Sequence, residues 1–267
     1  MIPLRDNIPP RTTPLVNYTL IGACALVFFG QLGEVSLVER YGMIPLRVLH
    51  PDQQIVIPEA RRVQTQFGVQ IVEAEHVVAP SAVAPWLTLL TCIFLHGGWM
   101  HFIGNMWFLF IFGDNVEDRM GHVGFLVFYL ASGIAASAAH LATNPSSPIP
   151  TIGASGAIAG VMGAYFYLYP HARVLTIVPI FIILQMIVLP AYVFLAIWFA
   201  LQFFQGVYSV GSTEATGVAW WAHIGGFAAG LAVTFALNQL HILRPQVDQI
   251  RPHTDHAGVY RLYPPRH

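Results

Sequence analysis

TIGASGAIAGVMGAYF, residues 151–166, is uncharged and consists almost entirely of small and apolar residues. Gly156, Gly160 and Ala164 recur at every fourth position, a spacing typical of membrane helices whose backbones pack closely. Ser155 lies near the start of the stretch, inside Gly-Ala-Ser-Gly. Taken alone, a serine at such a helix contact is packing material. Its role therefore depends on which other polar residues reach it.

The composition places this stretch in a membrane protein that crosses the bilayer several times. The chain has 267 residues, of which 9% are charged and 55% hydrophobic, whereas soluble domains carry about a quarter charged residues. Several apolar runs are long enough to cross a bilayer, which takes about 20 residues per helix. These runs do not alternate in polarity, as the strands of a membrane barrel do. The sequence therefore predicts an all-α polytopic membrane protein.

Six spans are expected around the opening stretch. The first apolar run is too long for a signal peptide and is followed by no cleavage site, so we expect it to remain as a span. The run 174–206 is too long for one helix and too short for two, and Pro179 and Pro190 interrupt it. We expect an apolar interfacial segment there, followed by one span. The six expected spans are 15–33, 99–117, 121–142, 153–169, 188–206 and 218–238.

This count divides the chain into a cytoplasmic N-terminal segment, 1–14, a six-span domain, 15–238, and a cytoplasmic tail, 239–267. All twelve basic residues are arginines. With both termini inside, the short outside loops hold none of them, as the positive-inside rule favours. The long first loop, 34–98, holds four, but long loops cross the membrane largely regardless of charge. We expect this loop to lie partly in the outer leaflet and the tail to be solvated.

Polar residues gather at the starts of the second, fourth and sixth spans, which all run from outside to inside in this arrangement. His101 and Asn105 are four residues apart and so share a helix face. Ser155 opens the fourth span, and His223 follows the start of the sixth. Polar and ionisable groups are costly inside a membrane and usually functional. We expect these four side chains to meet near the outer leaflet.

Such a group can carry out acyl transfer. A serine hydroxyl is a weak nucleophile unless a base removes its proton, and His223 can be that base for Ser155. Gly226 and Gly230 lie on the same helix face as His223, so close packing of the sixth span would aim this histidine inward. A developing oxyanion needs donors, which His101, Asn105 and the Ser155 backbone N–H can supply. Two further glycines allow a loop-to-helix turn and close substrate approach there: Gly153 and Gly156.

The sequence resembles the rhomboid family of intramembrane serine proteases over roughly residues 86–238. One motif of the Gly-x-Ser-Gly kind would be a weak signal, but three motifs in order, each opening an expected span, are strong together. A fourth pattern ends the second span. The matching stretches are His101-Phe-Ile-Gly-Asn105, Gly153-Ala-Ser-Gly156, Ala222-His-Ile-Gly-Gly226 and Glu117-Asp-Arg-Met-Gly121.

The resemblance implies a serine endopeptidase with a Ser155–His223 dyad, no acidic third member, and an oxyanion site near His101 and Asn105. The implied substrates are single-span or polytopic membrane proteins, cleaved within the bilayer near the outer end of a transmembrane helix. No metal or organic cofactor and no nucleic acid is expected. The short six-span form suggests a prokaryotic inner membrane. Structural support is implied for His96, and helix-end ties for Glu117 and Arg119.

The chain departs from the family at one position next to the dyad. Some members carry a tyrosine one helical turn after the serine, stacked under the catalytic histidine. Ala159 occupies that position here. Another group must therefore orient His223, and the sequence does not show which.

Several other interpretations remain open. A zinc site of His96, His101 and His223 is conceivable, since three histidines can bind zinc, but no HExxH motif or carboxylate supports it. His101 and Asn105 could instead bridge helices. A transporter would place polar groups near the midplane, often with internal repeats, and we find no repeat. A non-catalytic rhomboid-like binding or quality-control protein would keep the fold and lose the serine or histidine. Cys24 and Cys92 lie in apolar stretches and are expected to be packing residues.

Overall fold

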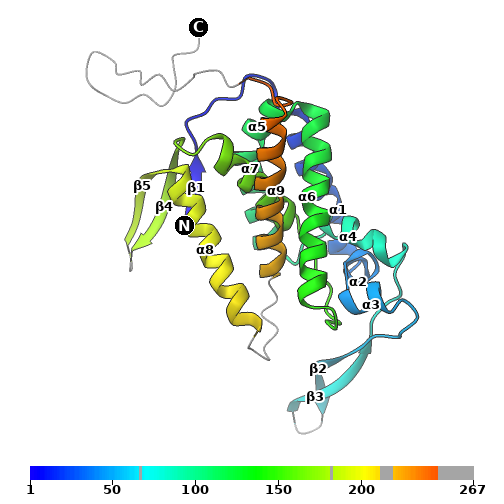
Figure 1. The fold of residues 1–267 in the computed structure, drawn as a ribbon. Coiled ribbons are helices and arrows are strands. Elements are labelled where there is room, and N and C mark those ends of the chain that lie inside the picture. The colour runs from blue at the N-terminus through cyan, green and yellow to red at the C-terminus, as the bar shows by residue number, and fades with distance from the viewer. Residues whose placement is uncertain (66–67, 181–182, 211–218, 246–267) are drawn as a thin grey trace.

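The computed structural model describes residues 1–65, 68–180, 183–210 and 219–245. Within these ranges, long helices form a bundle, with smaller elements attached at its sides (Figure 1). Each expected span corresponds to one of these helices, with ends that differ by up to four residues. The bundle helices are α1 (Leu15–Gly33), α5 (Trp99–Met120), α6 (His122–Thr143), α7 (Ser155–Leu168), α8 (Ala191–Val210) and α9 (Trp220–Gln239).

The lengths and apolarity of these helices confirm a helical membrane protein that spans the bilayer more than once. Helices α1, α6, α8 and α9 are each long and apolar enough to cross a membrane. Helix α5 passes the same test together with the segment Pro85–Phe94, although the two are bent by 79°. Helix α7 has only 14 residues. The described residues therefore contain four or five candidate spans, and the count of six stays a prediction.

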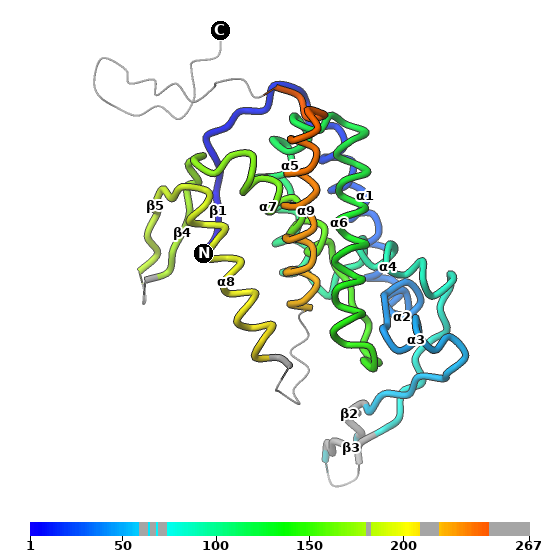
Figure 2. Tube along the Cα trace, viewed as in Figure 1, coloured from blue at the N-terminus to red at the C-terminus, as the bar shows by residue number. Residues whose placement is uncertain are grey.

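Helix α7 is the buried centre of the bundle. It contacts α5, α6 and α9, and nearly all its residues are buried. Helix α9 runs beside both α6 and α7 (Figure 2). A Cβ added at Gly226 would overlap the carbonyl oxygen of Gly156, and one at Gly230 would overlap that of Gly160. The small residues thus let the backbones of α7 and α9 touch, as expected from their spacing.

The long first loop is folded and holds the chain just before α7. Met43 and Thr151 exchange two backbone hydrogen bonds, of 3.1 and 2.7 Å, and the Gly153 N–H donates to the Cys92 carbonyl at 2.9 Å. A hairpin of strands β2 and β3 projects away from the bundle (Figure 1). The loop elements are α2 (Ser36–Tyr41), α3 (Pro45–Leu49), β2 (Val56–Thr65), β3 (Gly68–Val77), η1 (Pro85–Leu87), α4 (Thr88–Thr91) and η2 (Cys92–Phe94).

A small antiparallel sheet lies beside α8. Its strand order is β1 (Ile2–Arg5), β4 (Arg173–Ile180) and β5 (Ile183–Pro190). Strands β4 and β5 occupy the part of the chain where we expected an interfacial apolar segment, and α8 begins at Ala191, three residues later than expected. The expected cytoplasmic tail lies mostly outside the described residues, from residue 246 onward.

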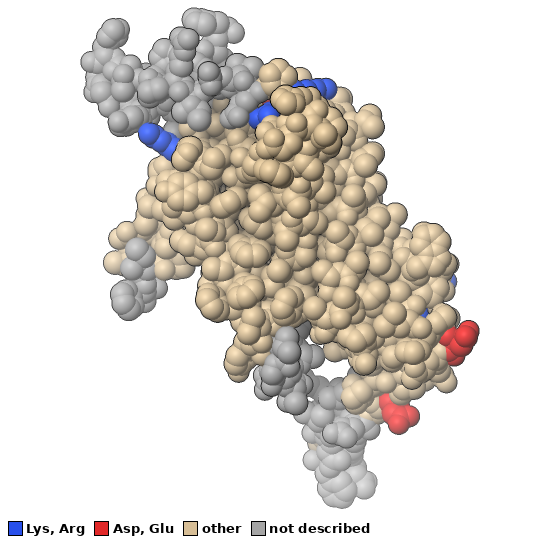
Figure 3. Space-filling model, viewed as in Figure 1, with Lys and Arg blue, Asp and Glu red and all other residues tan. Residues whose placement is uncertain are grey.

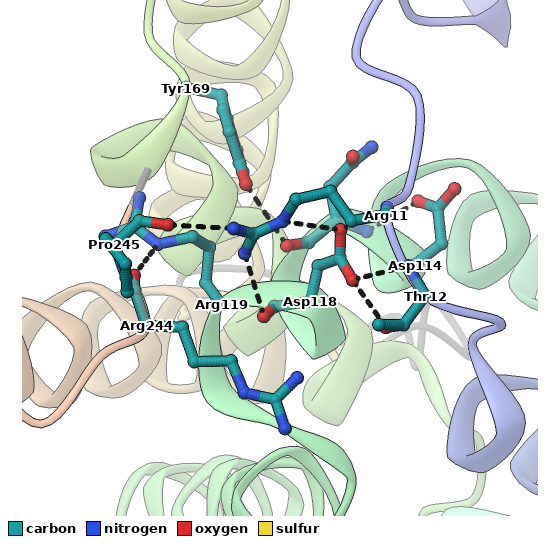
Figure 4. A network of polar contacts seen from close by, with 9 residues as sticks. Arg11, Thr12, Asp114, Asp118, Arg119, Tyr169, Arg244 and Pro245 are labelled. Carbon is teal, nitrogen blue, oxygen red and sulfur yellow. Dashed lines mark hydrogen bonds and ion pairs between the residues drawn. The ribbon is translucent and has the colours of Figure 1, made fainter. Parts of the chain in front are cut away.

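Charged side chains tie the helix ends together at the end of the bundle where α5 and α9 finish. Asp118 accepts hydrogen bonds from the backbone N–H groups of Arg11 and Thr12, at 2.5 and 3.1 Å (Figure 4). The Arg119 Nε donates to the Arg244 carbonyl at 2.7 Å. Charged residues on the face seen in Figure 3 lie near the two ends of the molecule, and the middle is uncharged, as a bilayer requires.

Candidate active site

Ser155 is the first residue of α7, directly after a turn that only glycine adopts easily. Gly153 has φ 127°, a conformation in which a side chain would be strained. A Cβ there would also lie 2.7 Å from the Cε1 and Nε2 atoms of His101. Glycine at position 153 therefore lets the chain turn into α7 and lets the imidazole of His101 lie against the turn, beside Ser155.

Ser155 and His223 are in hydrogen-bond contact. The Ser155 Oγ lies 2.7 Å from the His223 Nε2, although the two residues are 68 positions apart in the chain. His223 is in the first turn of α9, at the end where the glycine contacts bring α9 against α7. The structure thus brings together the two residues that the sequence analysis paired. A serine hydroxyl that donates to an imidazole is the arrangement needed for nucleophilic catalysis.

The other ring nitrogen of His223 contacts a residue that sequence reasoning missed. The Nδ1 of His223 lies 2.6 Å from the Gln202 Oε1, which comes from α8. The ring of Trp198, also on α8, has its centroid 5.9 Å from that of His223, and Trp220 adds a perpendicular ring at 6.1 Å. A glutamine inside an otherwise apolar span was the available signal, because such residues are rarely placed there without a role.

His101 is held in the tautomer that donates toward the turn at Gly153. The Gly97 backbone N–H donates to the His101 Nδ1 at 3.2 Å, so Nδ1 is an acceptor and the proton is on Nε2. The Nε2 atom is one of the two ring atoms that face Gly153. A donor N–H therefore points to the turn that carries Ser155, as an oxyanion site requires.

Asn105 follows His101 by one turn of α5 and is buried. Within the part of the chain that the structure describes, its Nδ2 amide group has no hydrogen-bond partner. Buried polar groups are almost always satisfied, so a donor of this kind calls for an explanation. A donor kept for a transient oxyanion is one such explanation.

A small cavity lies beside Ser155. Its volume is about 20 Å³, which is room for about one water molecule. Polar groups for such a molecule come from Ser137, Thr151 and Ser155, and the rest of the wall is mostly small apolar residues and backbone. Ser155 thus lines a space in which a water molecule can be held.

Three residues predicted to give structural support make contacts that hold helix ends and loops together. The backbone of His96 exchanges two hydrogen bonds with the Gln31 side chain, at 3.0 and 3.1 Å, which fixes the loop before α5 to α1. Glu117 accepts from the backbone N–H groups of Val16 and Asn17 and so caps the start of α1. Glu117 and Arg119 are at the far end of α5, about 24 Å along the helix from His101.

Comparisons with known proteins show similarity over the part of the chain that contains α5 to α9. The family model for the Rhomboid domain matches residues 84–240. The chain is 45% identical to Rhomboid protease GluP of Bacillus subtilis over 82 residues, which are 31% of this chain and 16% of that protein. It is 28% identical to RHOMBOID-like protein 5 of Arabidopsis thaliana over 171 residues, 61% of this chain and 47% of that one.

A third relative is Rhomboid protein 1, mitochondrial, of Saccharomyces cerevisiae, which is 33% identical over 96 residues, 34% of this chain and 28% of that protein. The chain spans less than half the length of each of these three relatives. The Rhomboid domain model nevertheless covers more than half of this chain and includes α5 to α9, the helices that carry His101, Ser155 and His223. On this match and on the helical membrane bundle, the chain belongs to the rhomboid family.

Proposed function

We propose that this protein is a serine endopeptidase that cleaves other membrane proteins within the bilayer. The observation that carries the proposal is the 2.7 Å contact between the Ser155 Oγ and the His223 Nε2. Polar groups are costly inside a membrane and usually functional, so a serine and a histidine held in contact there favour a chemical role. Relatives named as proteases, such as GluP of Bacillus subtilis, agree with it.

The geometry suggests the following acylation step. His223 accepts the Ser155 proton on Nε2 while Oγ attacks the carbonyl carbon of a substrate peptide bond. The resulting oxyanion is held by the Ser155 backbone N–H, the His101 Nε2–H and the Asn105 Nδ2 amide. His223 then passes its proton to the leaving amine, the C–N bond breaks, and an acyl-enzyme remains.

Deacylation repeats these roles with water. A water molecule gives a proton to His223 and attacks the ester carbonyl, and the proton returns to Ser155 as the ester bond breaks. The cavity beside Ser155 can supply that molecule to a membrane-embedded site. Because helical peptide bonds are hydrogen-bonded and sterically closed, a substrate helix must unwind before its carbonyl reaches Ser155.

The arginine distribution favours an N-in, C-in arrangement, with the dyad near the outer leaflet. We infer that the substrate enters laterally, beside α8 and residues 207–217. Residues 207–210 are the end of α8, and residues 211–217 lie outside the described residues. We propose a prokaryotic inner membrane as the location, on the expectation of six spans.

Cleavage of a tagged single-span reporter tests the proposal. The wild-type chain and Ser155→Ala are co-expressed with the reporter at equal levels, and purified samples are treated with a fluorophosphonate probe. We expect product and labelling with the wild type and neither with Ser155→Ala. Labelling without cleavage would indicate an active enzyme and an unsuitable reporter. A folded wild-type chain that is neither labelled nor active on a panel of reporters would instead be a non-catalytic member of the family.

A further inference from the structure

One face of α8 is directed at the start of α9. Trp198, Gln202 and Gly206 are spaced by four residues and so lie along one side of the helix. Trp198 and Gln202 both contact the imidazole of His223. A Cβ added at Gly206 would lie 3.0 Å from the Ile224 Cδ1, so α8 passes very near α9 at this level. Helix α8 is therefore placed to act on His223, the residue that contacts Ser155.

We propose that Gln202 is the positioning residue of the dyad, which sets the tautomer and the ring orientation of His223. This inference rests on the proposed function, since it assigns a role in the same site. The His223 Nε2 can take the Ser155 proton only if that nitrogen is unprotonated in the resting state. The neutral ring then has its proton on Nδ1, which donates to the Gln202 Oε1 at 2.6 Å.

The contact also explains how this chain functions with Ala159 one turn after Ser155. No ring on α7 supports the imidazole from that position, because the side chain of Ala159 is a single methyl group. Support comes from α8 instead, as a hydrogen bond from Gln202 and an aromatic wall from Trp198. Gln202 is 8% exposed, so its amide is held among packed groups and not in water.

A neutral amide suits a membrane site better than the carboxylate of a soluble serine protease. It accepts a hydrogen bond from the His223 Nδ1–H and fixes the ring, yet it adds no charge, which would be expensive at this depth. It stabilises a protonated imidazole less than a carboxylate does, because hydrogen bonds between two charged groups are stronger. Gln202 is thus a third hydrogen-bonding residue of the site, and it is an amide and not an acid.

The test compares two glutamines of the same helix. Gln202→Met keeps the length and shape of the side chain and removes the acceptor. Gln205→Met is the matched control, since Gln205 lies three residues later on α8 and is exposed. The readouts are the rate of Ser155 labelling by a fluorophosphonate at saturating probe, the probe concentration for half-maximal rate, and kcat on the tagged reporter.

We expect Gln202→Met to lower the maximal labelling rate and kcat about tenfold to a hundredfold, as the loss of one hydrogen bond to a group that becomes charged would. The half-maximal probe concentration and the reporter KM should change little, because the Gln202 side chain is buried and reaches the site through its hydrogen bond to His223. Gln205→Met should behave as the wild type. Equal rates in the two methionine variants, with an active wild type, would overturn the inference and leave the proposed function standing.

A second variant covers the case in which Gln202→Met does not fold. Gln202→Glu restores an acceptor of the same reach, so we expect it to label faster than Gln202→Met. The acid limb of its pH–rate profile should move to higher pH, because a carboxylate favours the protonated imidazole. An unchanged acid limb would mean that residue 202 does not act through His223 and would overturn the inference. An unlabelled, inactive wild type would reject both this inference and the proposed function.

Discussion

At the scale of single residues, two asparagines of α5 differ in what their side-chain amides do. The Asn105 Nδ2 has no partner among the described residues, whereas the Asn115 Nδ2 donates to the buried Asp6 carboxyl group at 2.8 Å. Both side chains are buried, and they are ten positions apart on the same helix. Their replacement by alanine therefore separates a catalytic role from a structural one.

We predict that Asn105→Ala lowers kcat on the tagged reporter by about 10²–10³, the usual effect of losing one oxyanion donor. Its thermal stability should change little, since no hydrogen bond from Nδ2 is lost. Asn115→Ala should leave kcat nearly unchanged. It should lose about 1–3 kcal/mol of stability, because the Asp6 carboxyl group then lacks one hydrogen-bond donor. Reporter kinetics and thermal unfolding of both variants check this. Loss of stability with full activity in Asn105→Ala would show that its amide is structural.

At the scale of helices, the contact between α7 and α9 sets the distance from Ser155 to His223. Gly226 follows His223 by one turn, and an added Cβ there would meet the backbone of Gly156, which cannot move aside as a side chain can. Helix α9 would have to shift away from α7, and the 2.7 Å contact between Ser155 and His223 would open. Packing and catalysis are therefore coupled through this pair of glycines.

We predict that Gly226→Ala costs about 1–3 kcal/mol of stability, as overpacking of a tight core does, and also lowers fluorophosphonate labelling of Ser155. The matched control is Gly22→Ala in α1, where an added Cβ has no heavy atom within 4 Å. That variant should be neutral or slightly stabilising, because alanine favours helix over glycine by about 1 kcal/mol. Thermal unfolding and labelling rates check both. A Gly226→Ala variant as stable and as reactive as Gly22→Ala would refute the close helix contact.

The sequence predicts a helix or strand well where the local residue pattern marks its ends, and poorly where contacts with distant segments decide them. The span 15–33 agrees with α1, Leu15–Gly33, because an apolar run between polar segments marks both ends of a membrane helix. Helix α5 runs three residues past the expected 117, since Asp118 and Arg119 find partners in other segments, which no local pattern reveals. The strands β4 and β5 were missed because a short apolar run is ambiguous between strand and helix.

The same limit applies to the candidate site. Ser155, His223, His101 and Asn105 were predicted from motifs that open separate helices, and the structure places Ser155 against His223 and His101 against the turn before Ser155. Gln202 has no such motif. Its role depends on how α8 lies against α9, a contact between two different helices. The sequence shows that a glutamine lies in a span, but only the packing of the helices shows which residue its side chain contacts.

At the scale of the whole molecule, a buried carboxyl group is one of the contacts that bind the N-terminal segment to the bundle. Asp6 accepts hydrogen bonds from the Tyr165 hydroxyl of α7 and the Asn115 amide of α5, at 2.5 and 2.8 Å. The Trp107 indole N–H, also from α5, donates to the Pro3 carbonyl at 2.6 Å. The segment before α1 is thus part of the folded protein, and its attachment passes through a group that titrates.

Burial raises the pKa of Asp6 from 3.8 to about 6, against the lowering effect of the Tyr165 hydrogen bond. Because this pKa is higher in the folded than in the unfolded chain, the folded state binds the proton more tightly between these values. Asp6 therefore favours folding most at low pH, and its contribution is lost as the pH rises from about 4 to about 6.

We predict that the wild-type chain in detergent gains about 1 kcal/mol of stability when the pH is lowered from 7 to 5, which is part of the roughly 3 kcal/mol that a pKa difference of this size provides at still lower pH. Asp6→Asn keeps the shape and hydrogen bonding of a protonated carboxyl group and should remove most of this gain. The difference between the two unfolding midpoints, measured across pH 4–8, isolates Asp6 from Asp114 and every other titrating group. Parallel curves for the two proteins would mean that Asp6 stays ionised in the fold, and the N-terminal segment would then be held by a charge that the bundle must solvate.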